Sequence, residues 1–199
     1  MININIILAS KSEIRKQMLE EADIPFEVIV SDADETPDLS KSFGEQLQDI
    51  SMRKAKIVFE KTINRGKRII VAADQNMVFD NVMYGKPSSI QKARELLKSM
   101  MGKDNIFAYT GNAILYADGN KIVKEINNYD ISRLSMDKLS DEVMERYLKD
   151  SKPLTKCGGI SISDAEFLHL KEGRLSTAYG MTIEYLQEMI KDVQLMNEK

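Results

Sequence analysis

The fold predicted for this chain is decided by Ile69-Ile70-Val71-Ala72-Ala73-Asp74-Gln75. Its first five residues are apolar and either small or β-branched, which is typical of a strand buried on both faces of a sheet. An acidic residue follows at once, so the strand is expected to emerge at Asp74. Ligands collect where the strands of open α/β sheets end, which makes Asp74 a candidate site residue. An ordinary aspartate that caps a turn is the alternative interpretation.

A second candidate, Lys86, stands between a glycine and a proline, which predicts a rigid turn. A short hairpin over residues 77–84, turning at Asp80-Asn81, precedes it. The hairpin would return the ammonium of Lys86 towards Asp74. A carboxylate and an ammonium brought together in this way suit a metal-bound phosphate.

Composition limits the class of protein. The 199 residues suffice for one sizeable core or two small lobes, and the chain is treated as a single domain over residues 1–199. Its apolar and charged fractions, 43% and 30%, are those of a soluble globular protein, and a net charge of −3 argues against non-specific nucleic-acid binding. The N-terminus resembles a strand, not a signal peptide, and no apolar run reaches membrane-spanning length. No membrane association and a cytoplasmic location are therefore expected.

An anion site is predicted near the N-terminus. Residues 2–9 are expected to form a strand, and a helix begins at Glu13 with Ser12 as its N-cap. The loop that carries Ser10 and Ser12 would direct hydroxyls and backbone N–H groups to the positive end of that helix. Arg15, in the first turn, would add a bidentate phosphate contact. A plain capped helix with an exposed arginine is the alternative.

An acidic loop follows the second predicted strand, over residues 25–30. Its three carboxylates, Asp32, Asp34 and Glu35, either bind a hard cation or form a solvated loop. A helix predicted over residues 41–63 carries Lys54, for which a solvated basic face is the alternative to a role in the site.

The second half of the chain predicts a helix, a long hairpin and two further helices. These lie over residues 88–101, 107–116 with 121–134, 141–148 and 180–196. Cys157 opens a loop, Cys157-Gly158-Gly159, where backbone can approach a ligand closely. As the only cysteine it excludes an intramolecular disulfide and a cysteine-cluster zinc site, and without a nearby histidine it is expected to be packed. His169, the only histidine, lies in a strand-like apolar run and is expected to be structural.

Short motifs occur along the chain in the order Leu8-Ala9-Ser10-Lys11-Ser12-Glu13-Ile14-Arg15, Asp34-Glu35-Thr36-Pro37, Lys54-Ala55, Ala73-Asp74-Gln75, Gly85-Lys86-Pro87, Tyr109-Thr110-Gly111 and Lys156-Cys157-Gly158-Gly159. In order and spacing this set resembles the Maf family of nucleotide pyrophosphatases, over nearly the whole chain. The resemblance implies a mixed α/β fold with an elongated central sheet, two lobes and a cleft between them. It also implies a homodimer.

The resemblance further implies a hydrolase that cleaves a nucleoside triphosphate between its α and β phosphates, with Mg²⁺ or Mn²⁺ as cofactor. By position, Asp74 would activate water or hold the metal, and Glu35 would be its partner on the metal. The phosphate-binding residues would be Ser10, Ser12, Arg15, Lys54 and Lys86, with Lys86 also a catalytic cation. This set suits the chemistry, because phosphoryl transfer needs charge neutralisation and in-line positioning more than covalent help.

Base selection is also hinted at by the resemblance. Gln75 after the aspartate, and Ile14 in place of a second arginine, resemble the branch that acts on 7-methyl-GTP, in which an acid near the position of Asp164 selects the base. Pyrimidine-selective members carry threonine and arginine instead. The chain departs from the family after Asp164, where Ala165-Glu166-Phe167 replaces a glycine-containing segment, and at Gly180-Met181-Thr182.

Two other functional classes of protein remain as alternatives to the enzyme. One is a catalytically weak nucleotide-binding regulator linked to septum formation. The other is a structural or interaction module in which these residues are incidental. The joint presence of Glu35, Lys54, Asp74 and Lys86 favours the enzyme, because a pure binder does not need the full set.

Overall fold

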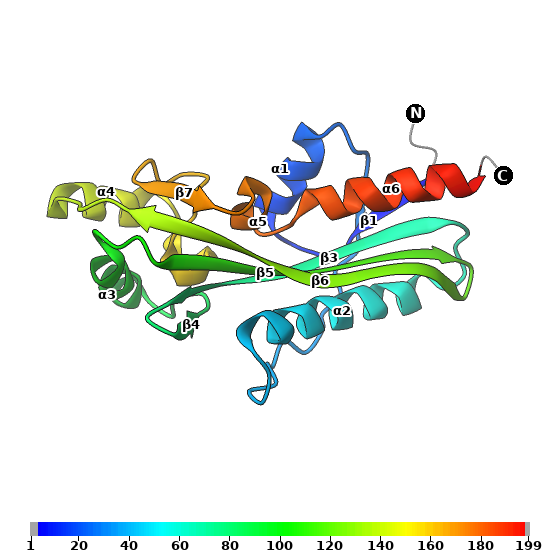
Figure 1. Cartoon of the computed structure of the whole chain (residues 1–199), viewed down its shortest axis with the longest axis horizontal. Helices are drawn as coiled ribbons and strands as arrows, with labels where there is room; N and C mark the ends of the chain where they lie inside the picture. The colour runs from blue at the N-terminus through cyan, green and yellow to red at the C-terminus, as the bar shows by residue number, and fades with distance from the viewer. Residues whose placement is uncertain (1–3, 198–199) are drawn as a thin grey trace. The chain divides into compact units, whose positions relative to one another are not determined.

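A computed structural model of the chain describes residues 4–197. Within these residues the chain has a mixed α/β fold, with a seven-stranded mixed sheet, six α-helices and two short 3-10 helices (Figure 1). The elements in chain order are β1 (Asn5–Leu8), α1 (Glu13–Glu21), β2 (Glu27–Val28), α2 (Phe43–Lys61), β3 (Arg68–Phe79), β4 (Val82–Tyr84), α3 (Ile90–Met100), β5 (Ile106–Asp118), β6 (Lys121–Met136), α4 (Asp141–Asp150), η1 (Pro153–Thr155), η2 (Cys157–Gly159), β7 (Leu168–Glu172), α5 (Leu175–Tyr179) and α6 (Ile183–Asn197). The predicted fold class is confirmed.

The chain divides into two compact units. The first is built from the described residues of 1–74, 110–130 and 180–199, and the second from 75–109 and 131–179. The boundaries fall inside β3, β5 and β6, so each unit contains a part of these three strands. The prediction of one domain over residues 1–199 stays a prediction, and so does the cleft between two lobes.

The first unit is organised around a short parallel sheet. β1 pairs in parallel with β2 on one side and with β3 on the other, with Leu8 opposite both Val28 and Val71. Helix α2 packs on one face of these strands, where it contacts Ile7 and Ile70, and Figure 1 shows α1 and α6 on the opposite face. Helices on both faces explain why the strand sequences are apolar without alternation.

Strand β3 does not end at Asp74, so that expectation is wrong. It continues to Phe79 and then turns back through Asp80 and Asn81 to pair with β4 in an antiparallel hairpin. Both turn residues have positive φ, 47° and 59°, as a tight two-residue hairpin turn requires. What ends near Asp74 is the parallel pairing with β1, whose last partner on β3 is Val71.

The second unit has its own apolar core. Side chains of β3, β5 and β6 meet those of α3, α4 and β7 there, including Phe79, Leu97, Leu134, Tyr147 and Leu168. The antiparallel pairing of β6 with β7 continues this layer. Helix α3 buries Ala93, Leu97 and Met100 in this core, and α4 buries Met144, Tyr147 and Leu148.

The other predicted elements are found with shorter or shifted bounds. The helices predicted over 41–63, 88–101, 141–148 and 180–196 correspond to α2, α3, α4 and α6, and the long hairpin to β5 and β6. The strand predicted over 2–9 is seen as β1, with residues 2 and 3 outside the described residues. Helix α5 was not predicted. None of the helices in residues 4–197 combines the length and the apolar character needed to cross a membrane.

Candidate active site

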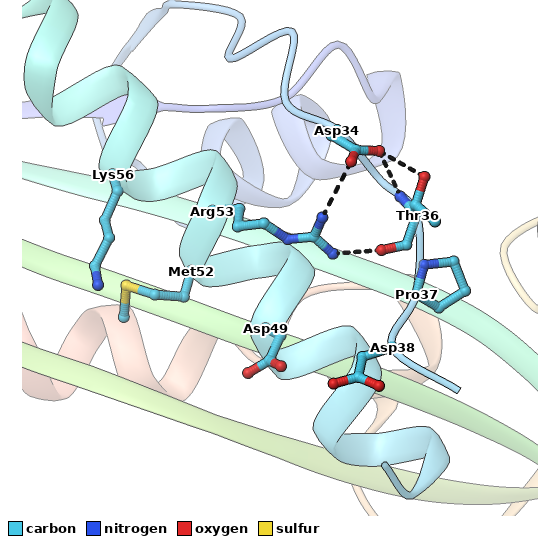
Figure 2. Close-up of a pocket in the computed structure, with 8 residues that line it drawn as sticks. All are labelled: Asp34, Thr36, Pro37, Asp38, Asp49, Met52, Arg53 and Lys56. Carbon is cyan, nitrogen blue, oxygen red and sulfur yellow. Dashed lines mark hydrogen bonds and ion pairs between the residues drawn. The ribbon is translucent and has the colours of Figure 1, made fainter. Parts of the chain in front are cut away.

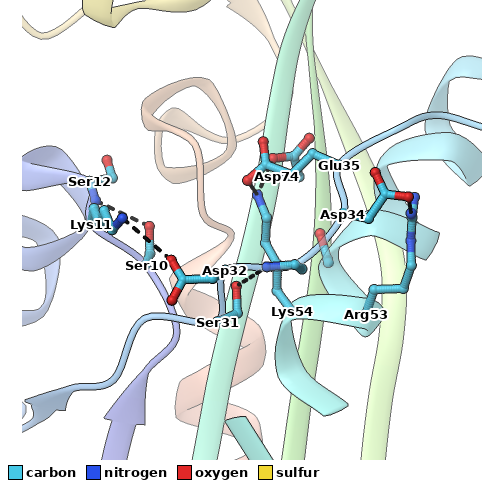
Figure 3. A network of polar contacts seen from close by, with 12 residues as sticks. Ser10, Lys11, Ser12, Ser31, Asp32, Asp34, Glu35, Arg53, Lys54 and Asp74 are labelled. Carbon is cyan, nitrogen blue, oxygen red and sulfur yellow. Dashed lines mark hydrogen bonds and ion pairs between the residues drawn. The ribbon is translucent and has the colours of Figure 1, made fainter. Parts of the chain in front are cut away.

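Lys54 lies at the centre of the candidate site, with its ammonium between two carboxylates (Figure 3). Its Nζ is 2.6 Å from Oδ1 of Asp74 and 2.9 Å from Oε1 of Glu35. The side chain of Lys54 is only 9% exposed and that of Asp74 16%, whereas that of Glu35 is 62% exposed. The alternative of a solvated basic face at Lys54 is therefore wrong.

Three segments distant in sequence bring this trio together. Lys54 comes from α2, which begins at a capping box formed by Ser42 and Glu45. Glu35 comes from the loop after β2, and Asp74 from β3 just beyond its pairing with β1. The carboxyl ends of parallel strands meet at one edge of a sheet, which is why residues that follow β1, β2 and the parallel part of β3 are neighbours.

The residues after β1 form a second polar cluster at this edge. Ser10 is buried, and its Oγ accepts from Nη1 of Arg15 at 3.1 Å and from the backbone N–H of Ser12 at 3.2 Å. Nε of Arg15 donates to the carbonyl of Gly180 at 2.7 Å. Arg15 is half-buried and the Ser12 side chain makes no capping bond, so the alternative of a plain capped helix with an exposed arginine does not hold.

The register of β1 and β3 relates this cluster to Asp74. Leu8 is opposite Val71, and the backbone N–H of Ala9 donates to the carbonyl of Val71 at 2.8 Å. Ser10 therefore leaves β1 alongside the part of β3 that leads into Asp74. The first unit thus presents two cationic side chains, Arg15 and Lys54, with hydroxyl and carboxylate groups at one sheet edge, which suits a phosphate chain and a water molecule.

Two carboxylates of the candidate site could hold a divalent metal ion. Asp74 and Glu35 supply carboxylate oxygens, the ligands that Mg²⁺ and Mn²⁺ prefer, and the two carboxylates outnumber the single ammonium between them. The described residues hold no group of three or more histidine, cysteine, aspartate or glutamate side chains that could bind a metal. Mg²⁺ commonly binds one or two carboxylates together with substrate phosphates and water, so the pair fits such an ion.

The acidic loop itself does not form one cation site. Asp32 pairs with Lys11 and Lys61, and Asp34 lies 3.8 Å from Arg53. Each acid of the loop thus faces a different basic partner.

Gln75, Lys86 and Asp164 belong to the second unit. Nε2 of Gln75 donates to the carbonyls of Thr177 and Ala178 at 2.9 and 3.1 Å. Lys86 is exposed in the turn between β4 and α3. The functional roles predicted for these three residues stay predictions, as do those of the site residues in the first unit.

The Cys157-Gly158-Gly159 loop joins two of the predicted motifs within the second unit. Sγ of Cys157 donates to the carbonyl of Gln75 at 2.8 Å, and the N–H of Gly158 donates to the carbonyl of Gly85 at 2.8 Å. Gly158 has φ of +65°, and an added Cβ would lie 2.9 Å from Cγ of Met77. The glycine allows this close approach, so the loop, Gln75 and the turn that holds Lys86 are fixed together.

The carboxylate of Asp164, predicted to select the base, already has two partners within the second unit. It forms an ion pair with Lys156 and accepts from the hydroxyl of Tyr147 at 3.3 Å. Burial, and then the charge of Asp164, raise the pKa of Tyr147 well above its ordinary value, so the phenol stays protonated and donates. Lys156 also lies over the Tyr147 ring, 5.4 Å from its centroid. Lys156 lies in one of the sequence motifs without a predicted role, and no sequence pattern marks Tyr147 as a site residue.

The family model described as Maf-like protein matches residues 5–193. The chain belongs to the Maf-like protein family. The resemblance drawn from the motifs is confirmed.

Two relatives of the Maf-like chain carry the name dTTP/UTP pyrophosphatase. The one from Bacillus mycoides is 31% identical over 188 residues, 94% of each chain. The one from Bacillus cereus is 31% identical over 192 residues, 96% of each chain. Both names agree with the predicted pyrophosphatase class. The 7-methyl-GTP branch is not confirmed and stays a prediction, as do the homodimer and the cytoplasmic location.

A solved structure also resembles this Maf-like chain weakly. It is the nucleoside-triphosphatase / dITP/XTP pyrophosphatase from Mycobacterium abscessus, 15% identical, covering 98% of this chain and 97% of its own, with a TM-score of 0.40. A score at this level supports no conclusion about function.

Proposed function

We propose that this Maf-like protein is a nucleoside triphosphate pyrophosphatase. It would hydrolyse the bond between the α and β phosphates and release a nucleoside monophosphate and pyrophosphate. The observation that carries the proposal is the ammonium of Lys54 held between Asp74 and Glu35 at the same sheet edge as Ser10 and Arg15. The name shared by the two relatives supports it.

The residues of the candidate site would have two roles, phosphate binding and activation of water. Arg15 and Lys54 would neutralise phosphate charge, and Ser10 would donate a hydroxyl hydrogen bond. An ammonium has three donors, so Lys54 can bind a phosphate oxygen while it still donates to Asp74. Asp74, largely buried, would orient the attacking water and accept its proton.

A divalent cation, Mg²⁺ or Mn²⁺, is part of the proposal. Asp74 and Glu35 would hold it, because they supply the oxygen ligands that such an ion takes. When bound, it would neutralise phosphate charge that the lysine and arginine leave uncompensated. Dependence of turnover on the added metal would test this part separately.

The names of the relatives favour dTTP and UTP as substrates, and 7-methyl-GTP is the second candidate. The second candidate rests on Gln75 and on an acid at Asp164. The pairing of Asp164 with Lys156 argues for the pyrimidines, because a carboxylate already compensated by a lysine attracts the cationic methylated guanine less.

A catalytically weak regulator linked to septum formation is the alternative function. Such a protein needs the phosphate-binding groups but not a carboxylate poised beside them. The hydrogen bond from Lys54 to Asp74, at 2.6 Å, supports the enzyme over the regulator.

The test is pyrophosphate release from dTTP, UTP, CTP and 7-methyl-GTP with Mg²⁺ or Mn²⁺. Turnover of any of them, with equal amounts of monophosphate and pyrophosphate, is the expected result. Turnover confined to 7-methyl-GTP would keep the reaction and reverse the order of substrates. No release from any triphosphate, with nucleotide still raising the melting temperature, would favour the regulator.

A further inference from the structure

The loop that carries Glu35 is held along helix α2 by basic side chains. Residues 29–38 form no helix or strand. Three side chains of α2 nevertheless contact this segment in order. Nζ of Lys61 donates to the carbonyl of Val30 at 2.8 Å, Nζ of Lys54 pairs with Glu35 at 2.9 Å, and Nη2 of Arg53 donates to the carbonyl of Thr36 at 2.7 Å. The loop therefore runs antiparallel to the helix.

Arg53 and Lys54 reach the loop from different directions. Neighbouring residues on an α-helix point about 100° apart, so the two side chains contact different parts of the segment. In this segment Lys54 pairs with the carboxylate of Glu35, whereas Arg53 donates to the backbone carbonyl of the next residue, Thr36. The bond from Arg53 restricts the main chain next to Glu35, which a bond to the flexible side chain of Glu35 does not.

The guanidinium of Arg53 spans both neighbours of Glu35 (Figure 2). Its Nη2 donates to the carbonyl of Thr36, and its Nη1 lies 3.8 Å from Oδ2 of Asp34. Asp34 closes a turn, because its Oδ1 accepts from the backbone N–H and the hydroxyl of Thr36 at 2.9 and 2.6 Å. These bonds from Thr36, and then the charge of Arg53, lower the pKa of Asp34. The turn and the guanidinium together fix the residues on each side of Glu35.

We propose that Arg53 is a positioning residue, which holds Glu35 against Lys54 and beside Asp74 through the turn formed by Asp34 and Thr36. The inference rests on the proposed function. Glu35 needs such support because its side chain is 62% exposed and packing restricts it little. Groups that bind phosphate or metal act well only within a few tenths of an ångström of the productive position.

Arginine suits this role better than lysine. Its planar fork can donate to a carbonyl and face a carboxylate at once, whereas an ammonium is a single point charge. The ion pair with Asp34 is exposed on both sides, and exposed pairs contribute little to global stability. Loss of Arg53 should therefore change the reaction more than it changes the melting temperature.

The chain offers a matched control on the same helix. Arg53 and Lys56 both line a pocket of about 480 Å³ in the first unit, with Asp34, Thr36, Pro37, Asp38, Asp49 and Met52 (Figure 2). Lys56 is exposed and forms no ion pair among those found in the described residues. Lys56→Ala thus removes a cation from the same pocket and leaves the turn intact.

The experiment compares Arg53→Ala, Arg53→Lys and Lys56→Ala in the full chain, by kcat and KM for pyrophosphate release from dTTP with Mg²⁺. Removal of a residue that orients a ligand-binding side chain typically lowers activity 10- to 100-fold, so about 10-fold in kcat is expected for Arg53→Ala. Arg53→Lys should recover part of it, and Lys56→Ala should match wild type. In a Glu35→Gln background, Arg53→Ala should cause little further loss.

A readout without substrate completes the test. Amide exchange of the segment 30–38 should speed up in Arg53→Ala and not in Lys56→Ala, at an unchanged melting temperature. Wild-type kcat in Arg53→Ala, or an equal loss in the Glu35→Gln background, would overturn the proposal. If wild type releases no pyrophosphate from any triphosphate, the proposed function fails, and with it the positioning role in that reaction. Exchange then separately decides whether Arg53 holds the loop.

Discussion

Gly111→Ala is the sharpest perturbation that the structure offers, because Gly111 lets β5 approach α2 without a side chain between them. An added Cβ would lie 2.3 Å from the carbonyl carbon and oxygen of Leu47 and 2.5 Å from the nitrogen of Gln48. Ordinary contacts begin near 3.4 Å. The shortfall of about 1.1 Å is against helix backbone, which cannot rotate away as a side chain can.

The displacement should reach the candidate active site. Lys54 lies further along the same helix, so a shift of α2 by about 1 Å would move its ammonium by a similar distance. A shift directed away from Asp74 would lengthen the present 2.6 Å contact to about 3.6 Å, beyond hydrogen-bond range. Misplacement of a reacting group by about 1 Å can lower the rate about 100-fold. Overpacking against backbone should also lower the free energy of unfolding by about 3 kcal/mol.

Urea unfolding and kcat for pyrophosphate release measure the two effects. Gly66→Ala is the control, because an added Cβ there meets nothing within 4 Å and the residue does not have positive φ. The control should keep wild-type kcat and change stability by less than about 1 kcal/mol. Wild-type stability and kcat in Gly111→Ala would refute the reasoning. Lost stability with full kcat would show that the position of α2 does not control Lys54.

Three further substitutions test the site and its support. Asp74→Asn should abolish measurable turnover while nucleotide still raises the melting temperature, because the substitution removes the proton acceptor and keeps the shape of the side chain. A wild-type kcat in this variant would show that Asp74 is not the proton acceptor. Lys54→Met should lower kcat at least about 100-fold, as loss of one charge-stabilising donor does in other enzymes. A higher KM with an unchanged kcat would show that Lys54 only binds the substrate. The buried guanidinium of Arg68 donates to the hydroxyl of Thr62 and to the carbonyls of Arg65, Gly66 and Gly119. Arg68→Met should therefore lower the free energy of unfolding, measured in urea, by about 3 kcal/mol. A loss below about 1 kcal/mol would mean that water replaces these bonds.

The sequence by itself determined the elements and the list of candidate residues. The unbroken apolar run before Asp74 predicted a strand buried on both faces, and the sequence predicted helices where α2, α3 and α4 lie. The signals behind these predictions are local, because the periodicity of a helix or strand depends on neighbouring residues only. The order of the motifs was enough to indicate the family.

Tertiary structure decided which polar groups meet. A lysine on an amphipathic helix is ordinarily solvated, and only the approach of β3 and the loop after β2 makes Lys54 a buried partner of Asp74 and Glu35. The same holds for Arg53, whose partner is a backbone carbonyl without any sequence signal, and for Asp164, which Lys156 compensates. Long polar side chains can reach several partners, and the choice among them depends on contacts between residues far apart in the chain, which no local pattern encodes.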